Sequence, residues 1–311
     1  MKKAIYTQYG SPEVIEVVDQ EKPIPRSNEV LVQIKASSVT RADAMMRQGV
    51  PKFGRLFLGL FKPKNTALGT GFSGIVAAVG DHVTQFETGD EVFGEKLFSN
   101  GCNAAYVCIA EDLVIDRKPK NILHSEAAPI CDGFLTSYHF LKDIAHVQPG
   151  QRVLINGASG SLGSAAVQLA KHMGATVTGV CSTKNIDFVK SLGADEVLDY
   201  ATVTLAELSC TYDVVYDTVG KLSYKKIKNI LGATGTFMTP VLSAAVLWRM
   251  MWQPKKVKFA ATGRKIPKYL SNSYVIWFNF LNKGSLPRIS IRNIAFQISN
   301  TPITILKPDV K

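Results

Sequence analysis

Residues 156–171, NGASGSLGSAAVQLAK, decide the fold of this 311-residue chain. The apolar run RVLI at 152–155 precedes them. Gly157, Gly160 and Gly163 come next, three positions apart. Apolar side chains then recur with the spacing of one helix face, at Ala165, Ala166, Leu169 and Ala170. The order predicts a strand, a glycine turn and the start of a helix.

Such a turn presents backbone N–H groups and the positive end of a helix dipole to an anion. Glycine is needed because a β-carbon would hold the backbone away from a pyrophosphate and would prevent the helix from packing closely on the strand. A tight turn that binds nothing also uses glycine, so the motif alone does not decide between the two.

The pattern that follows supports the functional interpretation. Strand-like runs occur at 176–180, 212–216 and 235–238, and a helical segment at 187–192 ends at Gly193. Strands that alternate with helices predict right-handed βαβ units and a parallel sheet. In that setting the turn predicts a dinucleotide site formed by Gly157, Ala158, Ser159, Gly160, Ser161, Leu162 and Gly163.

Composition describes a globular chain, with 46% hydrophobic and 20% charged residues and length enough for two domains. No apolar run approaches the span of a bilayer, and the N-terminus shows no signal peptide. The cysteines are odd in number and scattered, which is typical of buried thiols in a reducing compartment. We therefore expect a cytoplasmic protein.

The net charge of +11 is unevenly distributed. Residues 221–311 carry sixteen Lys and Arg against one acid, whereas residues 1–220 carry 20 basic and 24 acidic side chains. Attraction to anionic lipid or nucleic acid is one interpretation, and a solvated basic face is the other. Because the lysines are spread out and no RNA-binding signature accompanies them, we favour the solvated face. We expect no nucleic-acid partner and keep a membrane surface as the weaker alternative.

Residues 1–120 show a different pattern. Short strand-like runs, such as VLVQI at 30–34 and GIVAAV at 74–79, alternate with Gly and Pro turns. This β-rich block cannot belong to the parallel sheet that starts at Gln151, so it predicts a separate domain.

Several motifs together resemble the medium-chain dehydrogenase/reductase superfamily, in its quinone oxidoreductase-like (zeta-crystallin-like) branch. They are YGSPEV at 9–14, NEVLV at 28–32, the VGxxVxxFxxGDxVFG segment at 79–94, the glycine turn, LGADEV at 192–197 and YDVVYDTVG at 212–220. The resemblance implies an α/β chain with a β-rich GroES-like catalytic domain and a Rossmann domain built on a doubly wound parallel sheet. We assign residues 1–120 and 266–311 to the catalytic domain and residues 121–265 to the Rossmann domain. After Gly284 the expected family elements are hard to find, so we expect an atypical, poorly ordered C-terminal part.

The family includes zinc alcohol dehydrogenases, whose catalytic histidine ligand lies in a Gly-His-Glu segment. This chain has GTG at 69–71 and no cysteine in residues 38–43, where those enzymes carry a cysteine ligand. Their structural zinc needs four closely spaced cysteines, but only Cys102 and Cys108 are near each other here. We therefore predict no metal site.

The cofactor choice depends on the end of the second strand of the parallel sheet. An NAD enzyme usually places Asp or Glu about 20 residues past the glycine turn, whereas this chain has CSTKN at 181–185. No acid there repels a 2′-phosphate, and Lys184 and Ser182 can bind one, so we predict NADPH. The alternative is that Ser182 or Thr183 merely caps the next helix. The resemblance adds Tyr200 beside the adenosine ribose and, near the nicotinamide ribose, Thr136, Thr218, Val219 and Gly220.

Catalytic residues are less clearly indicated. The family pattern Asn-x-x-Asp-x-x-x-Arg-x-Gly corresponds here to residues 40–49, with Thr40 in place of the asparagine. A hydroxyl can still donate a hydrogen bond to a substrate oxygen, so Thr40 and Asp43 are the catalytic candidates. A structural ion pair between Asp43 and Arg47 is the alternative. Quinones and enones need little acid assistance because the developing charge is delocalised, and orientation by the cofactor site can suffice.

Taken with the resemblance, these observations predict an NADPH-dependent, zinc-independent oxidoreductase that transfers hydride to a quinone or an α,β-unsaturated carbonyl in a cleft between the domains. The alternative is a non-catalytic NADPH-binding or membrane-surface protein derived from the same family. We expect a homodimer. The apolar segment 52–62 is a lid over an apolar substrate, an interfacial membrane contact or a buried connecting loop.

Overall fold

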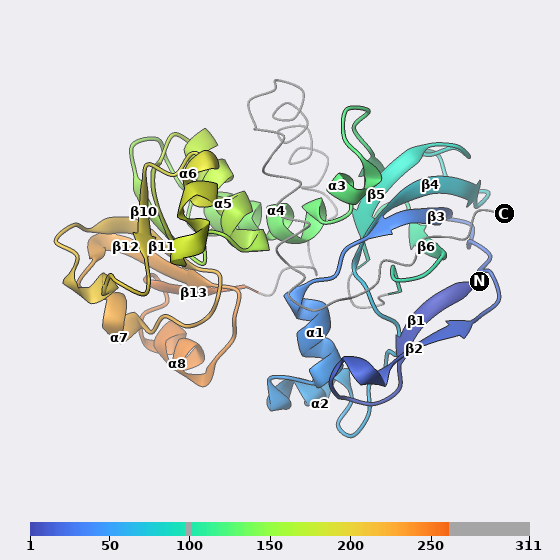
Figure 1. Ribbon diagram of the computed structural model, residues 1–311, viewed down its shortest axis with the longest axis horizontal. Coiled ribbons are helices and arrows are strands. Elements are labelled where there is room, and N and C mark those ends of the chain that lie inside the picture. Colours follow the sequence, from blue (N-terminus) through green and yellow to red (C-terminus); the bar gives the residue numbers. More distant parts are fainter. Residues whose placement is uncertain (97–100, 261–311) are drawn as a thin grey trace. The chain divides into compact units, whose positions relative to one another are not determined.

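The computed structural model describes residues 1–96 and 101–260 (Figure 1). Contacts divide the chain into two compact units, with the boundary between Asp132 and Gly133. The sequence predicts the boundary after residue 120, whereas the contacts place it inside helix α4 (Ile130–Tyr138). Our expectations for residues 266–311 concern a part of the chain that lies outside the described residues.

A parallel sheet of six strands forms the centre of the second unit, in the order β10-β9-β8-β11-β12-β13. Val153, Leu154 and Ile155 on its central strand are fully buried. These residues form a continuous apolar run in the sequence because helices cover both faces of the sheet. The strands are β8 (Arg152–Asn156), β9 (Thr176–Cys181), β10 (Glu196–Asp199), β11 (Tyr212–Asp217), β12 (Leu231–Thr239) and β13 (Val257–Phe259).

Helices connect consecutive strands of this sheet. From the central pair, the chain proceeds from β8 to β9 and β10 toward one edge of the sheet, and from β11 to β12 and β13 toward the other edge. Because each connection is right-handed, α5 and α6 lie on one face of the sheet and α7 and α8 on the other (Figure 1). This is the predicted doubly wound arrangement. After α4 come a π-helical turn (His139–Ile144), α5 (Ser161–His172), the 3-10 turn η4 (Thr183–Asn185), α6 (Ile186–Ser191), a 3-10 turn (Leu205–Glu207), α7 (Tyr224–Ile227) and α8 (Ala244–Trp252).

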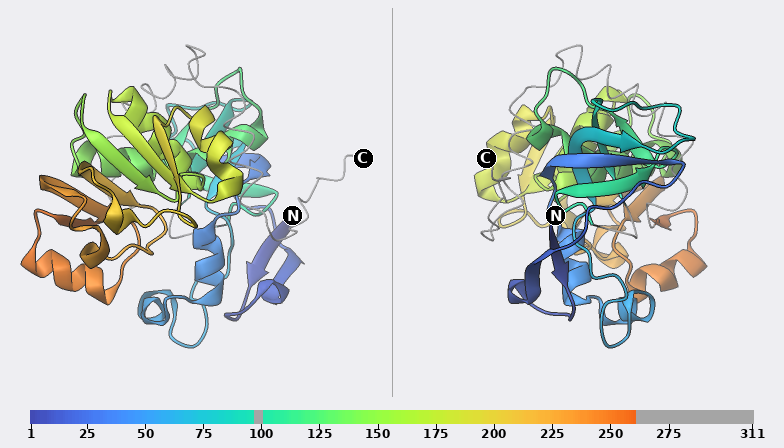
Figure 2. Two further views of the ribbon diagram at one scale, coloured as in Figure 1. Left: turned by 60° about the vertical axis from the view of Figure 1, so that its left-hand side comes forward. Right: turned by 90° about the vertical axis from the view of Figure 1, so that its right-hand side faces the viewer.

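The first unit contains the predicted β-rich domain. An antiparallel sheet has the order β6-β3-β4-β5-β7, and β1 and β2 form a separate two-stranded ribbon (Figure 2). Its core includes Val30, Val32, Phe72, Val76 and Val92. The strands are β1 (Lys2–Tyr6), β2 (Ile15–Asp19), β3 (Glu29–Ser37), β4 (Gly71–Val79), β5 (Glu91–Glu95), β6 (Tyr106–Ala110) and β7 (Val114–Arg117), and the helical elements are α1 (Arg41–Gln48), α2 (Arg55–Leu58), α3 (His124–Ala127) and 3-10 turns at Pro12–Val14 and Lys52–Gly54.

The apolar segment 52–62 lies on the surface of the first unit. Its large side chains are exposed, up to 90% for Phe61, and they are Phe53, Leu56, Phe57, Leu60 and Phe61. The interpretation as a buried connecting loop is therefore wrong. The segment is held by polar contacts instead: the Tyr9 hydroxyl donates to the carbonyl oxygen of Gly59 (2.6 Å), and Arg55 Nε donates to the carbonyl oxygen of Gly49 (3.0 Å).

The cysteines are all free thiols, as predicted, and none is fully exposed. Burial, followed by the nearby charge of Asp199, raises the pKa of the Cys181 thiol to about 11. This thiol is therefore protonated and unreactive at neutral pH. In the part of the chain that the structure describes, no helix has the length and hydropathy needed to cross a bilayer.

Candidate functional site

The glycine turn between β8 and α5 has no room for a β-carbon at two of its three glycines. Gly157 has a left-handed φ of 80°, and a β-carbon there would lie 2.4 Å from Cγ2 of Val219. A β-carbon on Gly163 would lie 2.0 Å from the carbonyl oxygen of Gly157. Gly160 has an ordinary φ of −80°, and its nearest neighbour would be 3.4 Å away. Packing therefore requires Gly157 and Gly163, while Gly160 leaves nearly empty space where a ligand can approach.

Helix α5 begins directly after this open position. Its N-cap is Gly160, which has no side chain to accept a hydrogen bond from the first turn. As in any first turn of a helix, the N–H groups of Leu162 and Gly163 have no intrahelical acceptor. Together with the helix dipole they form an anion cradle. The cradle fits the pyrophosphate of a dinucleotide, because no β-carbon at Gly160 fills it.

The carboxylate of Asp217, at the end of β11, organises the loop beside the cradle. It is fully buried. It accepts hydrogen bonds from Asn156 Nδ2 (2.8 Å) and from the backbone N–H groups of Val219 (3.1 Å), Gly220 (3.1 Å) and Leu222 (2.7 Å). Four donors compensate the loss of water around this charge. The loop is thereby fixed at the point where the strand order reverses, which is where open α/β sheets bind ligands.

Thr218 and Val219 are thus brought against Gly157 of the glycine turn, and the position of Thr218, Val219 and Gly220 near a nicotinamide ribose stays a prediction. The Thr218 hydroxyl donates to the carbonyl oxygen of Asn156 (2.8 Å). The importance of Asp217 was missed from the sequence, although its position at the end of an apolar strand within YDVVYDTVG was a usable signal.

The residues after β9 join the same edge of the sheet. Asn185 Nδ2 donates to the hydroxyl oxygens of Ser159 (2.9 Å) and Ser182 (3.1 Å). Because Ser182 accepts this bond, its own proton remains available for another acceptor. The Ser182 side chain does not cap η4, so the interpretation of Ser182 as a plain helix cap is wrong. Lys184 is exposed, and no ion pair in the described residues involves it.

Asp199 is an acid near this position that the sequence did not reveal. It ends β10, where its backbone is paired with Cys181, and it accepts a hydrogen bond from the Thr183 hydroxyl. That bond, followed by one from the N–H of Ala201 (2.9 Å), lowers the pKa of the Asp199 carboxyl. The Thr183 proton is therefore committed to Asp199, which leaves Ser182 and Lys184 as the free donors.

Thr136 and Tyr200 complete the predicted cofactor residues. Thr136 is half-buried on α4, next to Ser137, whose hydroxyl donates to the carbonyl oxygen of Leu162 (2.8 Å). This contact packs α4 on the start of α5. Tyr200 is exposed and follows β10, and its N–H donates to the carbonyl oxygen of Cys181 (3.1 Å). Thr136 therefore lies on a helix that packs at the cradle, whereas Tyr200 lies beside the end of β9.

Thr40 and Asp43 meet in the first unit as a capping box at the start of α1. Asp43 Oδ2 accepts hydrogen bonds from the N–H (2.8 Å) and the hydroxyl (2.9 Å) of Thr40, and the Thr40 hydroxyl oxygen accepts from the N–H of Asp43 (3.2 Å). Both side chains are buried, and burial raises the pKa of Asp43. These contacts give both residues a structural role, and a catalytic role stays a prediction.

Arg47 does not form the ion pair with Asp43 that was the alternative interpretation. Its Nε donates instead to the carbonyl oxygen of Gly10 (3.2 Å). Asp43 directs Oδ2 to the helix cap, its Oδ1 is buried without a hydrogen-bond partner, and no ion pair of the described residues joins it to Arg47.

Glu95 is a buried carboxyl of the first unit that the sequence did not single out. It is only 7% exposed at the end of β5. Burial, followed by the charges of Asp132 and Asp43, raises its pKa to about 8, against a hydrogen bond from the Thr70 hydroxyl. Thr70 lies in the segment where zinc dehydrogenases carry their histidine ligand. Among the described residues, no group of three or more His, Cys, Asp or Glu side chains is arranged to hold a metal ion.

Comparisons with known proteins agree with this geometry. The model of an alcohol dehydrogenase GroES-like domain matches residues 26–142, and that of a zinc-binding dehydrogenase matches residues 161–241. The chain is 35% identical over 232 residues to a 2-methylene-furan-3-one reductase of Solanum lycopersicum, covering 71% of this chain and 58% of that protein. It is 32% identical over 257 residues to a chloroplastic NADPH-dependent alkenal/one oxidoreductase of Arabidopsis thaliana, covering 77% and 64%.

Among solved structures, the quinone oxidoreductase from Coxiella burnetii superposes with a TM-score of 0.80 at 28% identity, covering 96% of this chain and 94% of that one. The chain spans 58% to 65% of the length of the first curated relatives that it matches. The two matched domains, the doubly wound sheet with its glycine cradle and these relatives lead to one conclusion. The chain belongs to the medium-chain dehydrogenase/reductase superfamily, in its quinone oxidoreductase-like branch.

Proposed function

We propose that this protein is an NADPH-dependent, zinc-independent reductase of quinones or α,β-unsaturated carbonyl compounds. The observation that carries the proposal is the anion cradle at the start of α5, where Gly157 and Gly163 are required by packing and Gly160 leaves room for a ligand. A cradle at the point where strand order reverses is the usual dinucleotide site of such sheets.

The residues of the second unit have distinct tasks in this proposal. The first-turn N–H groups from Ser161 to Gly163 bind the pyrophosphate. Asp217 holds the loop after β11 so that Thr218 and Val219 border the nicotinamide ribose. Tyr200 lies beside the adenosine ribose. The bound cofactor supplies hydride chemistry, and the protein binds it, orients it and excludes water.

The preference for NADPH rests on two donors, Ser182 and Lys184, whose protons are available to a phosphate oxygen. Lys184 is exposed and forms no ion pair within residues 1–96 and 101–260, and the Ser182 hydroxyl keeps its proton. Asp199 would repel a 2′-phosphate, but its charge already accepts bonds from Thr183 and Ala201. The attraction of Ser182 and Lys184 for the 2′-phosphate therefore exceeds its repulsion by Asp199, whose carboxylate is already hydrogen-bonded.

The substrate class rests on the contacts of Thr40 and on the relatives. The Thr40 proton is used in the helix cap, so it is not free to polarise a carbonyl. Acceptors that delocalise the negative charge need the least assistance, and these are quinones and enones. The names of two relatives, an alkenal/one oxidoreductase and a quinone oxidoreductase homolog, refer to such acceptors. These names support the same substrate class for this protein.

Replacement of Lys184 by alanine should weaken NADPH binding by about 1–3 kcal/mol, the size of a charge-assisted contact. NADH binding should change little, because NADH has no 2′-phosphate. Calorimetric titration with both cofactors measures the difference. Lys190→Ala removes an exposed lysine from α6 of the same unit and serves as the control. An equal loss for both cofactors would contradict the assignment of Lys184.

Metal analysis of the purified, active protein should find no stoichiometric zinc. The segment 69–71 has no histidine, and residues 38–43 have no cysteine, so two ligands of a catalytic zinc have no counterpart. Inductively coupled plasma mass spectrometry, before and after dialysis against a chelator, makes the measurement. One tightly held zinc per chain, removed together with activity, would refute this prediction.

The proposed activity is tested by following NADPH oxidation at 340 nm with a panel of quinones, enones and saturated aldehydes. We expect turnover with quinones or enones and none with saturated aldehydes, whose reduction requires a polarised carbonyl. A protein that binds NADPH and reduces no member of the panel would instead be the non-catalytic binding protein that is the second candidate.

A further inference from the structure

The outward face of helix α8 (Ala244–Trp252) is apolar along its whole length. Its exposed residues are Ala244, Ala245, Leu247, Trp248, Met251 and Trp252. Trp248 is 60% exposed, Met251 75% and Trp252 68%. A surface helix normally turns polar residues outward and apolar ones to the core. A contiguous exposed face of this kind marks an interaction site.

The one charged residue of α8 points the other way. Arg249 is half-buried and lies over the ring of Tyr224 on α7, with 5.4 Å between the guanidinium carbon and the ring centroid. The packing between α7 and α8 therefore stabilises this inverted arrangement, in which the apolar side chains of α8 face outward and its charged side chain faces inward.

The surroundings of this face are strongly basic. Residues 218–260 contain eight Lys and Arg and no acid, namely Lys221, Lys225, Lys226, Lys228, Arg249, Lys255, Lys256 and Lys258. Lys225 and Lys226 are exposed on α7, beside α8, and Lys255 is exposed in the turn that follows it. An apolar face with a cationic border complements an anionic surface that has an apolar interior.

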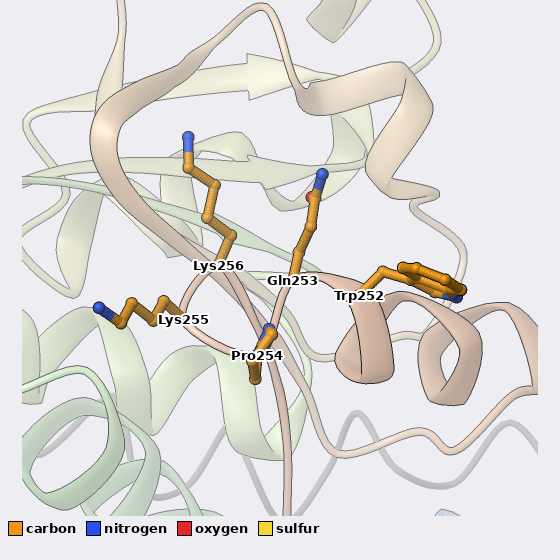
Figure 3. Close-up of a pocket in the computed structure, with 5 residues that line it drawn as sticks. All are labelled: Trp252, Gln253, Pro254, Lys255 and Lys256. Atoms are coloured by element: carbon orange, nitrogen blue, oxygen red, sulfur yellow. The ribbon is translucent and has the colours of Figure 1, made fainter.

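The turn after α8 carries aromatic and cationic side chains within one short stretch of chain. It lines a hollow of 390 Å³ formed by Trp252, Gln253, Pro254, Lys255 and Lys256 (Figure 3). Figure 3 shows the side chains of Trp252 and Lys255 on opposite sides of the turn, with Lys256 projecting between them. The Trp248 and Trp252 rings lie 5.9 Å apart between centroids. Tryptophan and lysine are the residues that settle at the headgroup level of a bilayer.

We propose that α8 and the turn after it bind the surface of an anionic lipid bilayer, with Leu247, Trp248, Met251 and Trp252 entering the headgroup region. The lysines around this face contact lipid phosphates and carboxylates. The inference goes beyond the proposed reductase activity and does not depend on it. It also reverses the preference for a solvated basic face that the charge distribution alone supported.

A second copy of the chain fits this face less well. A two-fold symmetric contact would place the same patch against itself, so the cations on both sides would oppose each other. A nucleic acid matches the charge but offers no hydrocarbon interior for Leu247 and Met251. A bilayer satisfies both the charge and the apolar face.

The test uses the full chain with Trp277→Phe, because Trp248 and Trp252 are then its two remaining tryptophans. We expect co-sedimentation and a blue shift of tryptophan fluorescence with phosphatidylcholine vesicles that contain roughly 30% phosphatidylserine. Pure phosphatidylcholine vesicles should give much weaker binding, and about 0.5 M salt should reduce the binding to anionic vesicles. Tryptophans shielded from acrylamide before vesicles are added would show that the protein itself covers this face, and would overturn the proposal.

Two paired variants and one control locate the surface. Trp248→Gln with Trp252→Gln should lower vesicle affinity about tenfold or more, because the anchoring aromatic area is lost. Lys255→Gln with Lys256→Gln should reduce the preference for anionic lipid. Phe57→Gln with Phe61→Gln alters equally exposed aromatic residues of the first unit and should leave binding unchanged, and circular dichroism verifies that each variant is folded.

Three results would contradict the proposal. The first is vesicle binding that survives the tryptophan pair or is lost only with the phenylalanine pair. The second is a tryptophan variant that changes a dimer to a monomer while its vesicle binding stays intact, which would show a second copy on the face. The third is binding to polyuridylate through these residues in place of binding to vesicles.

Discussion

Replacement of Gly163 by alanine should unfold or severely weaken the second unit and remove cofactor binding. Alanine is the better helix former by about 1 kcal/mol, but its β-carbon would lie 2.0 Å from the carbonyl oxygen of Gly157. A backbone atom cannot rotate away as a side chain can, so we expect a net loss of about 3 kcal/mol or more in the free energy of unfolding. Denaturant titration and NADPH titration measure the two effects.

Gly160→Ala is the matched control within the same motif. Its backbone is ordinary, and its β-carbon would have no neighbour closer than 3.4 Å. The fold should therefore keep its stability to within about 1 kcal/mol or gain slightly. Affinity for NADPH should still fall, because the added methyl group occupies the space in which the pyrophosphate approaches. Equal destabilisation by the two substitutions would contradict the packing that assigns them different roles.

Glu95→Gln should stabilise the first unit at pH 8 and have little effect at pH 4. The pKa of Glu95 is about 8 in the folded protein and 4.5 in its ordinary state. Between these values the folded protein binds the proton more tightly than the unfolded chain, so stability falls as pH rises from about 4.5 to about 8. At 1.36 kcal/mol per pKa unit, the difference approaches about 3–5 kcal/mol at the upper end.

Urea denaturation of the wild type and the variant at pH 5, 6.5 and 8 gives this difference. Glu87→Gln makes the same charge change at an exposed position and should have no comparable effect. If the gain in unfolding free energy from Glu95→Gln did not grow with pH, Glu95 would be ionised in the folded protein and its carboxylate would have a compensating partner.

The sequence was most informative where a local pattern and burial agree. Residues 153–155 are apolar because β8 is covered on both faces, and the helix predicted at 187–192 is found at Ile186–Ser191. The glycine that ends it, Gly193, has a φ of 97°. Each of these features depends on neighbours along the chain, so the pattern of residues was sufficient to predict it.

The interactions that tune the site depend on contacts between distant residues. Asp199 and Thr183 meet only because β9 and β10 pair in a register that places Asp199 opposite Cys181. The pKa of Glu95 is raised because the fold buries the end of β5 and, as a smaller effect, brings it near the charges of Asp132 and Asp43 from two other elements. The exposure of α8 could not be predicted from the sequence either, because an apolar run such as AAVLWRMMW is normally part of a core.

The most direct test of the central claim is calorimetric titration of the full chain with NADPH and with NADH. The anion cradle at α5 and the unpaired donors Ser182 and Lys184 predict one site per chain, with NADPH bound about tenfold or more tightly than NADH, since a charge-assisted contact is worth 1.4 kcal/mol or more. Saturable binding of neither cofactor, or equal affinity for both, would contradict the account.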